Sequence, residues 1–147
     1  MEVGLRIESA TREIAKPSGS PPLTTRSWTT HHALRPGVHT EIAGPSGTTI
    51  PLRINSFGIR GVEPSVPKPE NLLRIIYLGD EFILESKRME EETICGRLER
   101  MLKEKLRIPV EVINAGVPEF TPLLSYLQLR HSLMTLNPDL VLSLIHI

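Results

Sequence analysis

The second half of the chain alternates between strand-like and helix-like stretches, and this alternation limits the possible folds more than any other feature. Residues 72–78 (LLRIIYL) and 109–114 (PVEVIN) are short apolar runs rich in β-forming residues, and residues 140–147 (LVLSLIHI) begin a third. Such runs suit parallel strands that are covered on both faces. Two segments with helical spacing separate them. The order β-α-β-α-β predicts an α/β fold with a parallel sheet and right-handed connections.

The first helical segment is expected from about residue 90 to residue 106. Three glutamates lie at its start and basic residues lie towards its end, which matches the polarity of the helix dipole. Its apolar residues recur at helical spacing and predict one buried face, made of Ile94, Leu98, Met101, Leu102 and Leu106.

The second helical segment begins at Thr121-Pro122, a pair that is typical of an N-cap followed by the first helical residue. The helix is expected to stop at the Asn-Pro-Asp triplet of residues 137–139, where proline interrupts the pattern. Its predicted buried stripe consists of Tyr126, Leu129, Leu133 and Leu136.

The first half of the chain is built differently, because residues 1–70 hold 9 of the 13 prolines and 7 of the 10 glycines. We predict that residues 1–33 form a flexible polar tail, since they cannot bury enough apolar surface to offset their ordering entropy. Residues 34–70 are predicted to form a β-hairpin followed by a loop. The hairpin prediction rests on two alternating runs around a GPSG turn, namely Val38, Thr40 and Ile42, then Ile50, Leu52 and Ile54.

The composition excludes several classes of function. The chain has 17 basic and 17 acidic side chains, which argues against nucleic acid or an anionic membrane as the main partner. No apolar run approaches the length of a membrane span. A single cysteine excludes a disulfide framework and a multi-cysteine metal site, and we expect no cofactor. The first residues lack the apolar core of a signal peptide, so the cytoplasm is the default expectation for a compartment that the sequence does not fix. The oligomeric state is not indicated.

Four separated blocks resemble a known family when they are taken in order. They are LRPGVHTEIAG…PLRINSFGIRGVE, LRIIYLGDEF, VEVINAGVPEF and NPDLVL. Together, over residues 34–143, they resemble the opening half of an SGNH (GDSL-type) serine esterase. The resemblance implies an incomplete doubly wound, flavodoxin-like three-layer α/β/α fold preceded by a β-hairpin. Residues 71–147 would then be the first half of the α/β domain, and we expect the chain to be truncated at Ile147.

The resemblance also implies a chemistry. The family hydrolyses acyl or acetyl esters of small molecules, glycans or lipids through a serine in a G-D-S block after the first strand. A glycine after the second strand and an asparagine after the third supply oxyanion donors, and a late D-x-x-H pair supplies the base. A hydroxyl is a weak nucleophile and needs such a base and such donors.

This chain departs from the family pattern at the nucleophile. Gly79 and Asp80 match the first block, but Glu81 stands at the position of the serine, and Gly116 matches the oxyanion glycine. Glu119 stands where the family often has a second glycine. The asparagine block and the D-x-x-H pair do not occur in the sequence. Loss of a triad nucleophile costs about a millionfold in rate, so we expect no esterase activity from this chain.

Two other classes of protein remain as alternatives. The first is a non-catalytic SGNH-like binding protein, for which Glu81 is the main argument. The second is a receiver-like domain, because LRIIYLGDE and PDLVL superficially fit its acidic first strand end and its third strand. In that alignment the phospho-acceptor would be Leu144, which can neither bind Mg²⁺ nor accept a phosphoryl group.

Several side chains have both a chemical and a structural interpretation. Asp80 with Glu81 could form a metal-binding carboxylate pair, although no third oxygen ligand is evident. The three histidines at positions 31, 32 and 39 are interpreted as solvated rather than as a metal cluster. Cys95 is interpreted as a small buried hydrophobic residue. Asn55, Gly58 and Arg60 are expected to pack the hairpin segment against the sheet, with a substrate-facing role as the alternative.

Overall fold

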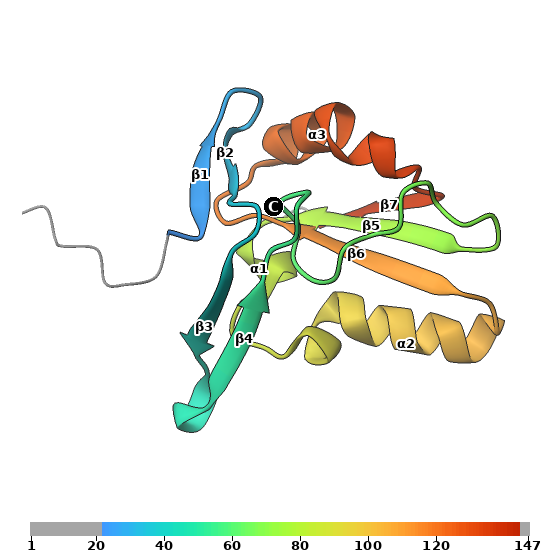
Figure 1. Cartoon of the computed structure of the whole chain (residues 1–147), viewed down its shortest axis with the longest axis horizontal. Helices are drawn as coiled ribbons and strands as arrows, with labels where there is room; N and C mark the ends of the chain where they lie inside the picture. Colours follow the sequence, from blue (N-terminus) through green and yellow to red (C-terminus); the bar gives the residue numbers. More distant parts are fainter. Residues whose placement is uncertain (1–21, 145–147) are drawn as a thin grey trace, which may run out of the picture.

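The computed structural model describes residues 22–144, and Figure 1 shows their arrangement. Two antiparallel hairpins come first, and an α/β unit follows. The hairpin strands are β1 (Thr24–Ser27), β2 (His31–Leu34), β3 (His39–Ala43) and β4 (Thr49–Arg53). The α/β unit contains β5 (Leu73–Gly79), α1 (Glu81–Leu84), η2 (Glu90–Glu92), α2 (Ile94–Leu106), β6 (Val110–Gly116), α3 (Pro122–His131), η3 (Leu133–Leu136) and β7 (Leu140–Ser143).

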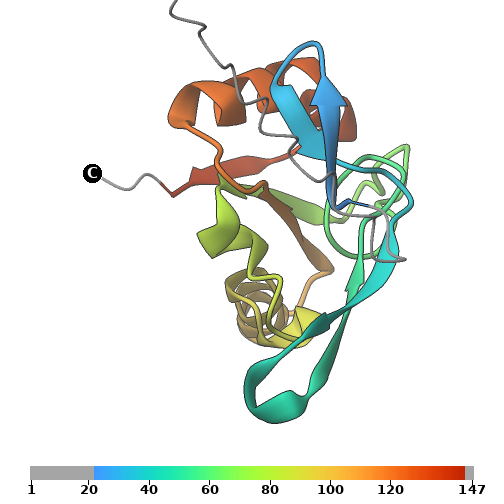
Figure 2. The ribbon, with the colours of Figure 1, turned by 90° about the vertical axis from the view of Figure 1, so that its left-hand side faces the viewer.

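The α/β unit is built on a parallel three-stranded sheet in the order β6-β5-β7. Helix α2 covers one face of this sheet, and α3 with η3 covers the other, as Figures 1 and 2 show. Side chains of β5 alternate between the two layers: Ile76 and Leu78 pack with Leu133 and Leu136, whereas Ile75 packs on the α2 side. The α/β prediction and the parallel sheet are therefore confirmed.

The predicted hairpin forms with the predicted alternation. Strands β3 and β4 pair antiparallel, with Thr40 opposite Leu52 and Ile42 opposite Ile50. Ile50 and Leu52 are buried, while the intervening β4 residues face outward. The GPSG turn contains a short 3-10 helix, η1 (Pro45–Gly47).

The predicted polar tail is wrong for residues 24–33, which form the hairpin β1–β2. Contacts with residues that are distant in the sequence hold this hairpin in place. Leu34 is almost completely buried in the core, and the His32 Nε2 lies 2.8 Å from the carbonyl oxygen of Pro118. Composition alone underestimates how well ordered such a segment is, because the apolar surface on which it packs belongs to another part of the chain. The remainder of the predicted tail, residues 1–21, lies outside the described residues.

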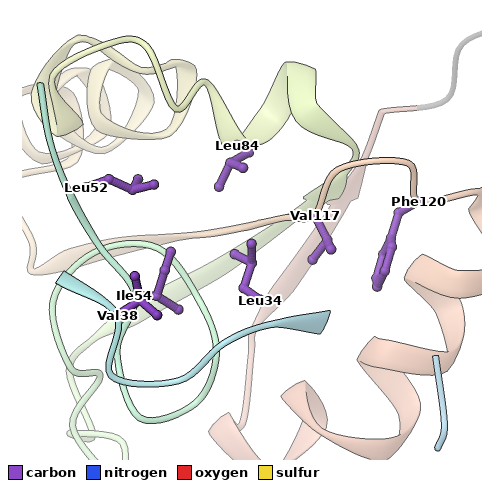
Figure 3. Close-up of a cluster of buried hydrophobic side chains, with 7 residues drawn as sticks. All are labelled: Leu34, Val38, Leu52, Ile54, Leu84, Val117 and Phe120. Carbon is purple, nitrogen blue, oxygen red and sulfur yellow. The ribbon is translucent and has the colours of Figure 1, made fainter. Parts of the chain in front are cut away.

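One core cluster joins the hairpins to the α/β unit (Figure 3). Its buried members come from three regions: Leu34, Val38, Leu52 and Ile54 from the hairpin half, Leu84 from α1, and Val117 and Phe120 from the loop after β6. The loop between β4 and β5 is irregular, as predicted, and makes isolated bridges from Arg60 to Ile54 and Asn114. The two halves of the chain therefore share a hydrophobic core.

The first predicted helix begins later in the chain than expected, and it buries only part of its predicted apolar face. The glutamates form the separate 3-10 turn η2, and Thr93 caps α2 by accepting a hydrogen bond from the Gly96 N–H at 3.1 Å. The helix buries Cys95 and packs Leu98 and Leu102 against the same cluster. The other three residues of the predicted face, Ile94, Met101 and Leu106, are exposed.

The second predicted helix has the expected start but a shorter body. Thr121 accepts a hydrogen bond from the Leu124 N–H, and Pro122 is the first helical residue. Helix α3 ends at His131, and the last two residues of the predicted stripe are buried in the separate turn η3. Tyr126 is exposed, contrary to the prediction, whereas Leu129 packs partly buried against the core cluster that contains Leu133 and Leu136.

The amino ends of the strands carry a charged network around the buried Arg74 that the sequence analysis did not find. Arg74 on β5 is fully buried and donates to the Glu111 carboxylate at 2.5 Å and to the carbonyl oxygens of Leu136 and Ser65. Asp139 accepts hydrogen bonds from the Lys68 ammonium and from the Arg74 N–H, and these bonds hold the pKa of Asp139 below its usual value.

Strand β7 forms the edge of the sheet in residues 22–144, where it pairs with β5. Its run begins at Leu140 as predicted, and residues 145–147 of the predicted strand lie outside the described residues. No helix within residues 22–144 combines the length and apolarity needed to cross a bilayer.

The predicted burial of Cys95 is confirmed, and it leads to a test of thiol reactivity. Burial, together with the nearby Glu85 carboxylate, raises the pKa of the Cys95 thiol to about 12. Because the thiolate is the reactive form, the native protein should not react with a disulfide reagent at mildly alkaline pH. We expect one thiol to titrate only after unfolding in guanidinium. Rapid stoichiometric reaction of the native protein would contradict the burial.

Candidate functional site

The carboxyl end of the central strand β5 leads directly into the short helix α1. Asp80 caps this helix: its side chain accepts a hydrogen bond from the Phe82 N–H at 3.0 Å, and its carbonyl oxygen accepts from the Leu84 N–H at 3.1 Å. Glu81 is the first residue of α1. The residue at the predicted nucleophile position therefore lies at the strand-to-helix turn, where α/β proteins of this topology bind ligands.

The loop after β6 reaches the same turn. The Val117 N–H donates to the Gly79 carbonyl oxygen at 3.0 Å, which ties the start of this loop to β5. Two residues later, the Glu119 N–H donates to the Glu81 carboxylate at 3.2 Å. Glu119 has a φ of +63°, in the left-handed region that favours glycine. The structure thus brings together position 81 and the loop in which the family often has a second glycine.

Gly116 lies at the carboxyl end of β6, where the resemblance implies an oxyanion donor, and in this structure its N–H has a partner within the fold. Its N–H donates to the Asn114 side-chain oxygen at 3.1 Å, and the same side chain donates to the Ile83 carbonyl oxygen at 2.7 Å. A Cβ added at Gly116 would lie 2.8 Å from the Asp80 carbonyl oxygen. Gly116 therefore lets α1 approach β6, and the backbone donor that contacts residue 81 belongs to Glu119.

Arg60 fixes the other end of the α1 turn. Its buried guanidinium donates to the carbonyl oxygens of Leu84, Glu85 and Arg88, each at 2.6 Å. Burial lowers the pKa of Arg60, while the carboxylates of Glu90 and Glu85 act in the opposite direction. These three contacts within the fold support the packing interpretation of Arg60, which also lines one side of the groove described below.

The loop that carries Arg60 is folded by Asn55. The Asn55 side-chain oxygen accepts hydrogen bonds from the N–H groups of Phe57 and Ile59, and its amide donates to the Val62 carbonyl oxygen at 2.8 Å. Gly58 has a φ of +70° and a carbonyl oxygen of Leu34 close to where its Cβ would lie. These contacts make Asn55 and Gly58 structural residues of the loop.

The N-terminal hairpin holds the loop that carries Glu119. The His32 Nε2–H donates to the Pro118 carbonyl oxygen, and the imidazole packs edge-on against Phe120 with ring centroids 5.2 Å apart. This assignment leaves His32 Nδ1 as the acceptor for the His31 Nδ1–H, 3.1 Å away. Within residues 22–144 no group of three or more histidine, cysteine or carboxylate side chains could hold a metal ion.

A groove of about 600 Å³ lies between β4, α2 and the edge of β6. Charged side chains of both signs line it, among them Arg53, Arg100, Lys103, Glu90, Glu91 and Glu104. Neither Glu81 nor Gly116 contributes to this groove. Its mixed charge does not indicate a particular ligand.

No protein-family model matches this chain, and no curated protein matches it either. The resemblance to SGNH esterases therefore rests on the order of the four sequence blocks and stays a prediction. Sequence reasoning singled out Glu81, Gly116 and Glu119, with Gly116 as the predicted oxyanion donor, but it did not anticipate the contact between Glu119 and Glu81. The glycine that the SGNH family often has at this position was the signal that could have drawn attention to the backbone of residue 119.

Proposed function

We propose that this chain carries the opening half of an SGNH-type ester hydrolase scaffold in which Glu81 replaces the nucleophilic serine, and that the chain does not hydrolyse esters. The observation that carries the proposal is the hydrogen bond from the Glu119 N–H to the Glu81 carboxylate. It joins the ends of two adjacent parallel strands, which are the places where the family pattern requires a nucleophile and an oxyanion donor.

The chemistry of position 81 supports inactivity. Oxyanion stabilisation requires a donor directed at the oxygen that becomes negative in the transition state. The Glu81 carboxylate accepts the N–H of Glu119, and its own negative charge would repel a developing oxyanion nearby. The sequence also has no D-x-x-H pair that could supply a base.

A non-catalytic binding protein on the same scaffold is the second candidate, and the Glu81–Glu119 contact favours it because the carboxylate is held at the end of the sheet without disrupting the fold. The receiver alternative gains no such support. Leu144 donates its N–H to the Leu78 carbonyl oxygen and presents no oxygen ligand at the phospho-acceptor position.

The enzymatic part of the proposal is tested with p-nitrophenyl acetate and p-nitrophenyl butyrate. We expect the wild-type chain to match the buffer rate, and Glu81→Gln and Glu81→Ser to do the same, since neither variant gains a base. A wild-type rate well above background that Glu81→Gln abolishes would contradict the proposal.

The lineage is tested separately by reading the source transcript through codon 81 and beyond codon 147. An in-frame G-x-N-D segment followed by a D-x-x-H pair would support the SGNH assignment. A confirmed reading frame that contains neither segment would overturn it, whatever the esterase assay shows.

A further inference from the structure

The two edges of the parallel sheet differ in how their backbone groups are used. Figure 1 shows β5 lying between β6 and β7, so each of these two strands has one side turned away from the sheet. On β6 the protein itself occupies that side. The Val112 N–H donates to the Glu99 carboxylate at 2.9 Å, and Asn114 forms a bridge with Arg60 in the loop before β5. The β6 edge is therefore closed to further strands.

The outer side of β7 has no such partner within residues 22–144, where β7 pairs with β5 alone. Backbone groups of successive strand residues point to opposite sides of the strand. The Leu144 N–H donates to the Leu78 carbonyl oxygen on β5 at 3.0 Å, so the backbone groups of Val141 and Ser143 point away from the sheet. A strand laid alongside β7 would supply hydrogen-bond partners for them.

The side chains of β7 are those of an inner strand rather than of an edge strand. Val141 packs into the cluster on the α3 side and Leu142 into the cluster on the α2 side, so both faces of the strand are apolar. Both side chains stay only half-buried and Leu140 is 48% exposed, whereas Ile76 on β5 is fully buried. Edge strands commonly carry a charge or a proline that discourages pairing, and residues 140–144 contain neither.

These properties define the strand that fits this edge: it is uncharged, apolar on both faces and free on one side. The β7 strand of a second copy meets all three conditions. Two identical strands that pair antiparallel are related by a twofold axis, and each copy then uses the same edge. Self-pairing brings like residues close together across the axis, so a charged edge would repel itself. The uncharged sequence of residues 140–144 avoids that repulsion.

We propose that two copies of the chain pair antiparallel through β7 and join their sheets into one continuous sheet. Each copy contributes three strands, and a sheet of this combined size is common in globular proteins. Because Glu99 and Arg60 close the β6 edge at both ends of the joined sheet, assembly stops at two copies and does not continue as a filament. The pairing uses neither Glu81 nor Glu119, so the inference does not depend on the proposed esterase lineage.

The assembly is measured on the full chain by sedimentation velocity over a range of protein concentrations. We expect a soluble species of twice the chain mass that dissociates on dilution. Hydrogen exchange above and below the dissociation midpoint then locates the interface. The amides of Val141 and Ser143 should exchange at least about tenfold more slowly in the dimer than in the monomer. The amide of Ile76, inside the sheet, should be protected in both.

Variants at Ser143 test the edge directly, because this side chain is exposed and does not contribute to the core. Ser143→Lys puts a positive charge on the edge of each copy and should weaken dimerisation by more than about tenfold. Ser143→Pro removes an outward N–H donor and should weaken it similarly. Thr49→Lys is the matched control, since it adds the same charge at an exposed position of β4. All three variants should keep the wild-type circular dichroism spectrum, which separates dissociation from unfolding.

Each of four results would overturn the proposal. A wild-type monomer at high concentration whose Val141 and Ser143 amides exchange freely has no partner at this edge. Protection of these amides in a monomer would mean that another segment of the same chain covers β7. A dimer that is equally stable in Ser143→Lys and Ser143→Pro forms through another surface. Assemblies larger than two copies would show that the β6 edge is not closed.

Discussion

Replacing Arg60 with alanine should destabilise the protein by about 3–5 kcal/mol, because a buried carbonyl oxygen left without its donor costs about 1–3 kcal/mol and Arg60 donates to three of them. The substitution leaves the carbonyl oxygens of Leu84, Glu85 and Arg88 without their donor and opens a cavity beneath α1. Urea unfolding followed by circular dichroism measures the loss. Hydrogen exchange should show that the amides of α1 open more readily than those of β5.

Two further variants make the Arg60 experiment specific. Arg60→Lys keeps the charge but cannot place donors on three carbonyl oxygens at once, so its stability should lie between that of the wild type and that of Arg60→Ala. Arg100→Ala removes an exposed arginine and should change stability by less than about 0.5 kcal/mol. Equal stabilities for Arg60→Ala and Arg100→Ala would show that the guanidinium does not support the turn.

Arg74→Ala should have a comparable effect at the opposite end of the sheet, again about 3–5 kcal/mol. The Arg74 side chain is fully buried in the central strand, and its removal would leave Glu111 and two backbone carbonyl oxygens without their donor. Urea unfolding measures the difference in free energy. A double-mutant cycle with Glu111→Gln then separates the ion pair from the two carbonyl contacts.

Arg74→Met provides the companion variant because it retains most of the buried volume. If packing alone stabilises this position, Arg74→Met should unfold at the same urea concentration as the wild type. We expect it to be clearly less stable, since the carbonyl oxygens of Leu136 and Ser65 lose their donor in either variant. Wild-type stability in Arg74→Met would contradict the role of the hydrogen bonds.

The strands of the parallel sheet were the most predictable part of this fold, whereas β1 and β2 were predicted to belong to a polar tail. Residues 72–78 and 109–114 are short, mostly apolar runs rich in β-forming residues, and such runs suit a parallel strand that helices cover on both faces. Helix faces were less predictable. In α2 the apolar residues extend around more of the helix than the sheet can cover, so periodicity alone could not separate the buried Cys95 from the exposed Ile94 and Met101.

The position of the candidate site in the fold was predictable, but the contacts between its residues were not. Topology alone brings Glu81 and Gly116 to the same edge of a parallel sheet. The contacts that define the turn join residues far apart in the sequence: Arg60 with Leu84, and His32 with Pro118. Local spacing carries no information about such pairs. Arg74 was missed for the same reason, because a lone arginine within an apolar strand gives no sign of its distant partners.

The shared core also sets an order of events during synthesis. Its hairpin residues are made first, but the surface they pack on includes Leu84, Val117 and Phe120 (Figure 3). A nascent chain that has not yet released Phe120 from the ribosome cannot complete this core, because the loop after β6 is still missing. The two hairpins therefore emerge as segments with apolar faces and no partner. We therefore expect the hairpins to reach their final packing only after the α/β unit has been made, because Leu84, Val117 and Phe120 supply part of the surface they pack on.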